Sequence, residues 1–127
     1  MGDLSKDFSR SEFACKCGCG FDAVKPYLVE QLQKMRDQLG FEIIVESGCR
    51  CSRHNAEVNG AVDSSHLTGE AADLKPAGGK PWGSEVRFRF MEAALAARFK
   101  RVGIGETIFH VDISTILPWP RLWLYEK

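Results

Sequence analysis

An amphipathic helix followed at once by a short apolar strand is the feature that most limits how this chain can fold. Between Pro26 and Leu39 the apolar residues recur at helical spacing, and Gly40 is a suitable stop. Residues 41–45 are apolar and rich in β-formers, and they predict a buried strand. At 127 residues the chain is long enough for one core around such a pair, but not for two full domains.

The other expected elements are short and follow no regular strand–helix–strand order. Ser9–Glu12 has a capping-box pattern for one turn, and residues 52–59 predict a helical turn or two. A second helix should be capped by Ser84 and run to about Phe99. Its buried side should carry Val86, Phe90, Ala93, Ala94 and Ala97. The expected strands lie at residues 69–74, 101–104, 107–113 and, along an edge, 122–125.

This mixture of helices and strands predicts the α+β class in a single domain. The domain is expected to span residues 1–127, with the cysteine-containing segment 1–23 packed on it. The tryptophans Trp82, Trp119 and Trp123 are predicted to be core or rim residues rather than platforms for a sugar, because aromatic side chains dominate core burial.

Composition restricts the class of function. The 17 basic and 17 acidic residues cancel, whereas nucleic-acid-binding modules usually show a basic excess, so no nucleic-acid partner is expected. No apolar run approaches the roughly 20 residues that a membrane span needs, so no membrane insertion is expected. The first residues lack the basic start and apolar stretch of a secretory signal, which predicts synthesis in the cytoplasm.

The chemistry-bearing residues gather around two of the three histidines. His66 precedes Asp73 with Gly69 between them to permit a sharp turn, and His110 lies in a later strand. Two imidazoles and one carboxylate suit Zn²⁺ and leave a fourth position for water, which is the arrangement of a catalytic site. Each residue also has an ordinary alternative role: His66 as the cap of a turn, Asp73 as the partner of a lysine in an ion pair, and His110 as a histidine packed within a strand.

The order of these residues resembles a known family. Ser-x-His-x-x-Gly-x-Ala-x-Asp at Ser64–Asp73, followed by His-x-Asp at His110–Asp112, is similar to the zinc D-Ala-D-Ala carboxypeptidases, peptidase family M15. Ser-Gly-x-Arg at Ser47–Arg50 agrees with this resemblance, which covers about Leu4 to Tyr125. The chain is most similar to compact, single-domain members of phages and prophages. The resemblance implies a hedgehog/D-Ala-D-Ala peptidase-like fold, with an antiparallel central sheet flanked by helices.

The resemblance also implies roles for individual residues. His66, Asp73 and His110 would bind one catalytic zinc ion, and Arg50 would meet a carboxylate or carbonyl oxygen of the substrate. Two residues, Ser64 and Ser65, are candidate hydrogen-bonding groups near the substrate or simply shape the turn. The expected reaction is cleavage next to D-amino acids in peptidoglycan stem peptides or cross-links, as a carboxypeptidase or an endopeptidase.

Location and assembly follow from this expected substrate. Peptidoglycan lies outside the membrane, so a chain without a visible export signal would act on the cell wall after release or export by another route. The short length leaves little room for a separate wall-binding module. We expect the protein to act as a monomer.

The general base is where the sequence departs from the family. Many relatives have an acidic residue three positions before the last ligand, but here that position is Thr107. Two carboxylates remain. Strand alternation places Asp112 on the same face as His110, which makes it the preferred candidate, and Glu106 in the preceding turn is the alternative. Asp112 would otherwise orient a ligand. Without a working base, the chain would be a catalytically inactive, zinc-dependent peptidoglycan- or peptide-binding protein.

Five cysteines form a second group of candidate ligands. They are Cys15, Cys17, Cys19, Cys49 and Cys51. Four thiolates from this group would hold a second, structural zinc ion. Alternatively, one or two disulfides would tie the N-terminal segment to the residues beside Arg50, or the thiols would stay reduced and buried. The sequence leaves these three alternatives open.

Overall fold

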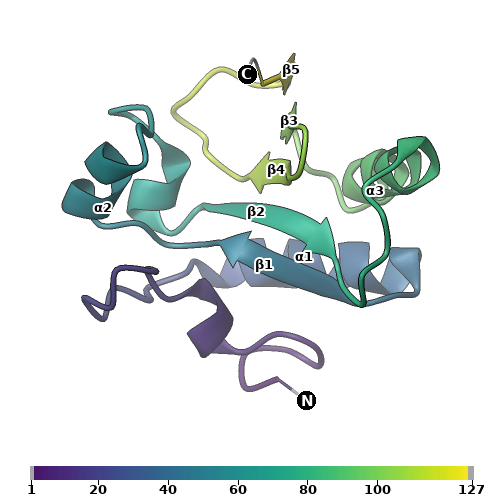
Figure 1. Cartoon of the computed structure of the whole chain (residues 1–127), viewed down its shortest axis with the longest axis horizontal. Helices are drawn as coiled ribbons and strands as arrows, with labels where there is room; N and C mark the ends of the chain where they lie inside the picture. Colours follow the sequence, from purple (N-terminus) through teal and green to yellow (C-terminus); the bar gives the residue numbers. More distant parts are fainter. Residues whose placement is uncertain (1, 126–127) are drawn as a thin grey trace.

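A five-stranded sheet runs through residues 2–125, the part of the chain that this computed structural model describes (Figure 1). The strands are β1 (Ile43–Ser47), β2 (Ala71–Pro76), β3 (Arg101–Ile104), β4 (Phe109–Asp112) and β5 (Arg121–Leu124), in the spatial order β1-β2-β4-β3-β5. The helical elements are η1 (Arg10–Phe13), α1 (Pro26–Leu39), α2 (Ser52–Glu57), η2 (Ser65–Thr68) and α3 (Ser84–Ala96). The expected α+β class is confirmed.

The sheet is mixed rather than purely antiparallel. Strands β1, β2, β4 and β3 pair antiparallel in that order, whereas β5 runs parallel to β3. Asp112 at the end of β4 and Arg121 at the start of β5 both pair with Arg101. The chain therefore leaves β4 and enters β5 at the same end of β3, which makes β5 parallel to it. The expected antiparallel sheet is correct for four strands and wrong for the last.

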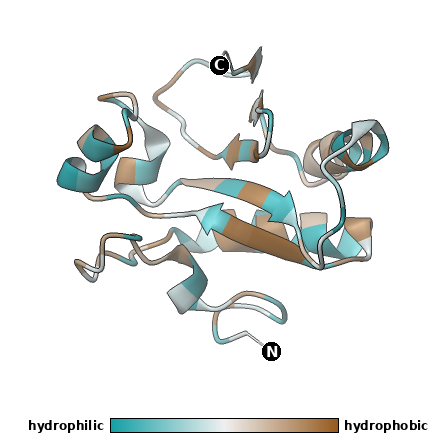
Figure 2. Ribbon diagram, in the orientation of Figure 1, coloured by the Kyte–Doolittle hydropathy of each residue, from teal (hydrophilic) through white to brown (hydrophobic). Residues whose placement is uncertain are grey.

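Helices α1 and α3 pack against each other and contribute to the core beside the sheet. The helical spacing of α1 places Leu28, Leu32 and Met35 in the core without solvent exposure. Phe90 of α3 meets Phe109 of β4 edge to face, with ring centroids 5.5 Å apart. Figure 2 shows hydrophobic stretches along β1 and β2, in front of α1. Burial of these apolar faces holds the strands that carry the candidate site.

Several boundaries differ from those expected. Ser84 is the first residue of α3 rather than its cap, and the cap position is Gly83. The helix ends at Ala96 instead of continuing to Phe99, because Arg98 takes a left-handed conformation with φ of 68°. Val86 is only half-buried, while the other four residues expected on the buried side of α3 are buried. Strand β1 lies at the sheet edge and alternates in burial, so it is buried on one face only.

The N-terminal segment packs against the hydrophobic core through two aromatic side chains. Phe8 and Phe13 are 1% and 0% exposed. Ser9 and Glu12 form the capping box of η1, in which the Ser9 backbone N–H donates to the Glu12 carboxylate at 2.7 Å. The backbone N–H of Cys49 donates to the Phe13 carbonyl at 2.9 Å, which links this segment to the residues before α2. None of the helices described is both long and apolar enough to cross a membrane.

Candidate metal centre

Elements far apart in the sequence bring His66, Asp73 and His110 together. His66 lies in η2, which ends at Gly69 with φ of 72°, a conformation that favours glycine. A Cβ at Gly69 would also overlap the carbonyl oxygen of Ala23. The chain then enters β2, where Asp73 pairs directly with His110 of β4. The turn and the strand register therefore direct all three side chains to one place.

The candidate ligand atoms are close enough to share one metal ion. Asp73 Oδ1 lies 2.8 Å from His110 Nδ1 and 3.4 Å from His66 Nε2. One donor atom from each of the three residues lies within 4.8 Å of the others. Zinc–ligand bonds of about 2.0–2.1 Å in a tetrahedron place neighbouring ligand atoms about 3.3 Å apart. The observed separations are near this value, so small side-chain shifts accommodate the ion.

Each imidazole has its remaining nitrogen engaged. His66 Nδ1 lies 2.6 Å from the carbonyl oxygen of Gly48, which only accepts, so this nitrogen carries the proton. His110 Nε2 lies 2.7 Å from Asp112 Oδ2. These contacts leave His66 Nε2 and His110 Nδ1 facing Asp73. His66 Nε2 is buried and has no hydrogen-bond partner among the described residues, as expected for a nitrogen prepared to bind a metal.

Electrostatic coupling within the group changes the proton affinities of Asp73 and His110. Burial by itself would raise the pKa of Asp73, but the hydrogen bond from His110 and the electrostatic attraction of the two neighbouring imidazoles hold it well below its usual range. Burial would lower the pKa of His110, but hydrogen bonds to Asp112 and Asp73 outweigh this effect and raise it. Asp73 is therefore a carboxylate at neutral pH, and a metal ion must compete with a proton for His110.

Asp112 connects one candidate ligand, His110, to the guanidinium of Arg101. The strand register sets it opposite Arg101, whose Nε donates to Asp112 Oδ1 at 2.7 Å. The backbone N–H of Ser114 donates to the same oxygen at 3.2 Å, and the other oxygen receives His110. Asp112 is 2% exposed. Both carboxylate oxygens are thus engaged, Oδ2 by the imidazole of His110 and Oδ1 by Arg101 and Ser114.

A cavity of about 480 Å³ lies over the three candidate ligands, and Arg50, Ser64 and Ser65 are in its wall. Arg50 Nη1 donates to Asn55 Oδ1 at 2.9 Å, whereas its Nε is buried with no partner among the described residues. Burial lowers the pKa of Arg50. Ser64 Oγ caps η2 by accepting from the His66 backbone N–H at 3.2 Å. The Ser65 hydroxyl is buried without a partner in the described part of the chain.

Sequence reasoning missed the wall of the cavity that β3 and β5 build. Trp123 and Tyr125 lie against His110, with ring centroids 5.3 and 6.4 Å from the imidazole. Gly103 pairs with both His110 and Trp123, and a Cβ there would lie 2.5 Å from the Trp123 indole nitrogen. The glycine within a strand was the available signal, because such glycines mark close approach. Burial raises the pKa of Tyr125.

The tryptophans fall in three different environments. Trp82 packs against Phe90 and Phe109, with ring centroids 5.0 and 6.1 Å away, and is a core-side residue as expected. Trp119 is 48% exposed and has Lys100 over its ring. Trp123 lines the cavity.

The two carboxylates considered for proton transfer are placed differently. Asp112 is among the residues that line the cavity, and it lies on the same face as His110, as strand alternation predicts. Glu106 is exposed in the turn between β3 and β4 and is not among the described residues in the cavity wall. Its backbone carbonyl accepts from Arg87 Nη2 at 3.3 Å. The neighbouring Ile108 does line the cavity.

The cysteines separate into a cluster and a lone buried residue. The sulfurs of Cys15, Cys17, Cys19 and Cys51 all lie within 4.8 Å of one another. Cys49 does not belong to this group and is 1% exposed within the core. All five are free thiols. The structure therefore gathers four sulfurs. Of the neighbouring cysteines Cys49 and Cys51, it is Cys51 that joins the cluster.

Comparison with known families gives one match. A family model described as peptidase M15 matches residues 6–114. This range runs from the N-terminal segment to the end of β4 and includes Arg50, all three candidate ligands and Asp112. A comparison with curated proteins finds no match.

Proposed function

The chain belongs to the peptidase M15 family, and from this premise we propose that it is a zinc metallopeptidase that cleaves bonds next to D-amino acids in peptidoglycan. The observation that carries the proposal is the buried Nε2 of His66, which has no hydrogen-bond partner within residues 2–125 and faces Asp73 beside His110. A nitrogen in this state loses hydrogen-bond energy unless a metal ion binds it. The family match and this geometry support the same site.

The donor set fits zinc. His66 Nε2, His110 Nδ1 and a carboxylate oxygen of Asp73 would be the ligands, and two imidazoles with one carboxylate suit this borderline ion. When bound, zinc would supply Lewis-acid polarisation of the scissile carbonyl and a bound water of lowered pKa. The protein holds the ligand orientation through Gly48 and Asp112, each of which engages the opposite nitrogen of one imidazole.

Arg50 is proposed to bind the substrate. Its guanidinium lies in the cavity wall, half-buried, with Nε unpartnered among the described residues. A buried cation gains most from a charged partner, and a guanidinium binds a carboxylate through two parallel hydrogen bonds. A peptide that ends in a free D-amino acid supplies that carboxylate. Ser65, whose hydroxyl also lacks a partner in the described part of the chain, is proposed to hydrogen-bond the peptide backbone.

Proton transfer is assigned to one of two carboxylates by their surroundings. Asp112 already holds His110, Arg101 and the Ser114 backbone, so we assign it the positioning of His110. Glu106 is the remaining candidate, two residues before Ile108 of the cavity wall. Its proposed task is to take a proton from the attacking water and deliver it to the leaving amine.

The proposed setting follows from the substrate. All of the proposed ligands and Arg50 come from one chain, so the protein is proposed to act as a monomer. Because peptidoglycan lies outside the cell membrane, the enzyme is proposed to reach the wall after release or export by another route.

Metal analysis with activity measurements tests the function. Wild type and His66→Ala are compared for zinc bound at the site and for cleavage of purified peptidoglycan and of a peptide ending in D-Ala-D-Ala. We expect zinc and cleavage to be lost together in His66→Ala. His54→Ala is the matched control, because His54 lies in α2, pairs with Glu57 and is outside the metal group. Loss of cleavage without any change in bound zinc would contradict the proposal.

A second candidate function is supported by the placement of the two acids. Both oxygens of Asp112 are engaged, and Glu106 is outside the cavity wall formed by the described residues. A protein arranged in this way would bind zinc and a peptidoglycan peptide without turnover. Wild type that binds zinc through His66 and retains peptidoglycan on a pull-down, yet cleaves neither substrate, would establish this function instead.

A further inference from the structure

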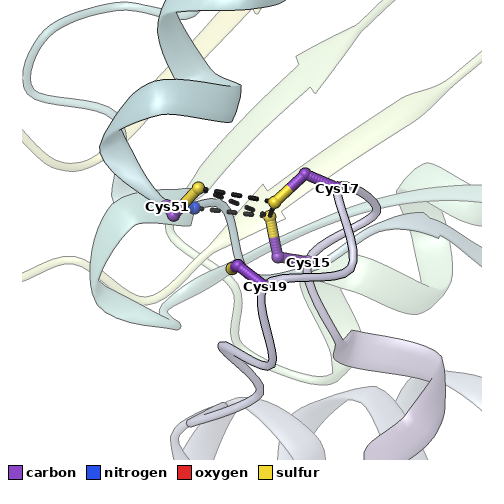
Figure 3. A group of neighbouring side chains, drawn as sticks. All are labelled: Cys15, Cys17, Cys19 and Cys51. Atoms are coloured by element: carbon purple, nitrogen blue, oxygen red, sulfur yellow. Dashed lines mark hydrogen bonds between the residues drawn. The ribbon is translucent and has the colours of Figure 1, made fainter.

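The cysteine cluster is built by a loop that folds back on itself. Cys15, Cys17 and Cys19 lie in this loop, and Cys51 reaches it from the N-terminus of α2 (Figure 3). Gly18 and Gly20 have φ of 83° and 94°, so two left-handed residues turn the chain between and after the last two loop cysteines. The backbone bond from Cys15 N–H to the Phe21 carbonyl, 2.8 Å, closes the loop. Backbone geometry thus brings three sulfurs of one segment to a fourth.

The sulfur–sulfur distances among Cys15, Cys17 and Cys51 fit ligands of one ion, and the Cys19 sulfur lies within 4.8 Å of all three. Cys15 and Cys17 lie 3.4 Å apart, Cys17 and Cys51 3.6 Å, and Cys15 and Cys51 3.9 Å. A disulfide needs about 2.05 Å between sulfurs. Zinc–sulfur bonds of about 2.3 Å in a tetrahedron place the sulfurs about 3.8 Å apart. The observed distances scatter around the tetrahedral value.

Hydrogen-bond donors and a cation surround the sulfurs. The backbone N–H of Cys51 donates to Cys15 Sγ at 3.5 Å, and that of His54 donates to Cys51 Sγ at 3.4 Å. The guanidinium of Arg53 is close enough to the Cys17 and Cys51 sulfurs to interact with both electrostatically. Backbone donors and a nearby guanidinium stabilise negative charge on sulfur. A tetrathiolate zinc site carries a net charge of about −2 and needs such support.

We infer that Cys15, Cys17, Cys19 and Cys51 bind a structural zinc ion, separate from the His66–Asp73–His110 site. Four protein ligands leave no open position, so this ion would stabilise the fold rather than act on substrate. Cys49 is excluded because it is buried in the core and does not belong to the cluster. This inference does not depend on peptidase activity.

The position of the cluster indicates what the ion would stabilise. Cys51 directly follows Arg50. Gly48, whose carbonyl orients His66, lies three residues before Cys51. The metal would therefore join the N-terminal loop to the short segment that supports both the candidate substrate-binding residue and a ligand of the other site. Zinc loss at the cysteines should loosen this support.

Cobalt substitution in the His66→Ala protein tests the inference, because this variant removes a ligand of the other site. Tetrahedral Co²⁺ bound by thiolates gives an intense sulfur-to-metal absorption band in the near ultraviolet. We expect about one equivalent of cobalt with this band in His66→Ala, and its loss when Cys17→Ser is added. Cys49→Ala in the same background is the matched control and should retain the band.

A thiol-reactivity measurement on the wild-type protein tests the same inference without requiring that a cysteine variant folds. In the zinc-loaded protein the four cluster thiols should react slowly with a thiol reagent, and a strong chelator should accelerate them. Absence of the cobalt band from His66→Ala, or recovery of cluster cysteines as disulfides in peptide maps, would overturn the inference. A protein without peptidase activity that retains the band would refute only the proposed function.

Discussion

Replacing Asp112 by asparagine separates a role in positioning His110 from a role in proton transfer. In the wild type, one carboxylate oxygen receives His110 Nε2 and the other receives Arg101 Nε, both at 2.7 Å. Asparagine keeps the shape but has one accepting oxygen, and its amide nitrogen would face one of these two donors. The substitution also removes the charge that neutralises Arg101. We therefore expect Asp112→Asn to weaken both the fold and zinc binding at His110.

The size of the effect follows from burial. Removing one partner of a buried ion pair costs about 3–5 kcal/mol. The Arg101 side chain is 13% exposed and keeps its bond to the Pro118 carbonyl, so the lower value of about 3 kcal/mol is appropriate. For 127 residues this corresponds to a fall in Tm of about 11 °C. Loss of a residue that orients a metal ligand typically lowers metal affinity about 10–100-fold.

Three measurements check this prediction: competition with a zinc-binding dye, thermal unfolding, and hydrolysis at saturating zinc. Saturating zinc should restore part of the activity of Asp112→Asn, because a positioning residue acts through occupancy and orientation of the site. Glu106→Gln is the comparison variant and should keep wild-type zinc affinity and Tm while losing activity. If Asp112→Asn instead binds zinc as tightly as wild type and unfolds at the same temperature, yet has lost turnover, the reasoning is refuted and Asp112 carries the proton.

Three further predictions concern substrate binding, packing and pH. Arg50→Lys should raise KM about 10–100-fold for peptides with a free C-terminal carboxylate, and less for amidated ones, because an ammonium cannot form the paired hydrogen bonds; steady-state kinetics on both substrates measures the difference. Gly103→Ala should lower the free energy of unfolding by about 1–3 kcal/mol, measured in denaturant, because its Cβ would displace Trp123. In the metal-free protein, the raised pKa of His110 adds stability below its ordinary value of 6.5 that is lost as pH rises through the folded value. The lowered pKa of Asp73 adds stability above its ordinary value of 3.8 that is lost as pH falls through the folded value. Calorimetry with chelator should therefore show a maximum between about pH 4 and 6.5, and a maximum that persists unchanged in His110→Ala would contradict this assignment.

Local features of the fold were predictable from the sequence. Helix α1 has the expected bounds, because its apolar spacing and Gly40 act within a few residues. His66 and Asp73 lie only seven positions apart around a glycine turn, so their approach also depends on nearby backbone geometry. The face of β4 shared by His110 and Asp112 follows from strand alternation.

Pairing over long distances was decided only in the tertiary structure. Nothing near Asp112 in the sequence identifies Arg101 as its partner, because that contact depends on the register of β3 against β4. The direction of β5 and the contact of Trp123 with His110 depend on where the chain re-enters the sheet.

The cysteines and the metal group show the same division. The sequence by itself supplied the ligand types, two imidazoles with a carboxylate and a set of thiols, together with the turns that gather near neighbours. Only the tertiary structure placed Cys51 in the thiol cluster and Cys49 in the core. The physical reason is that helical and strand periodicity act over a few residues, whereas packing of distant segments selects which side chains meet.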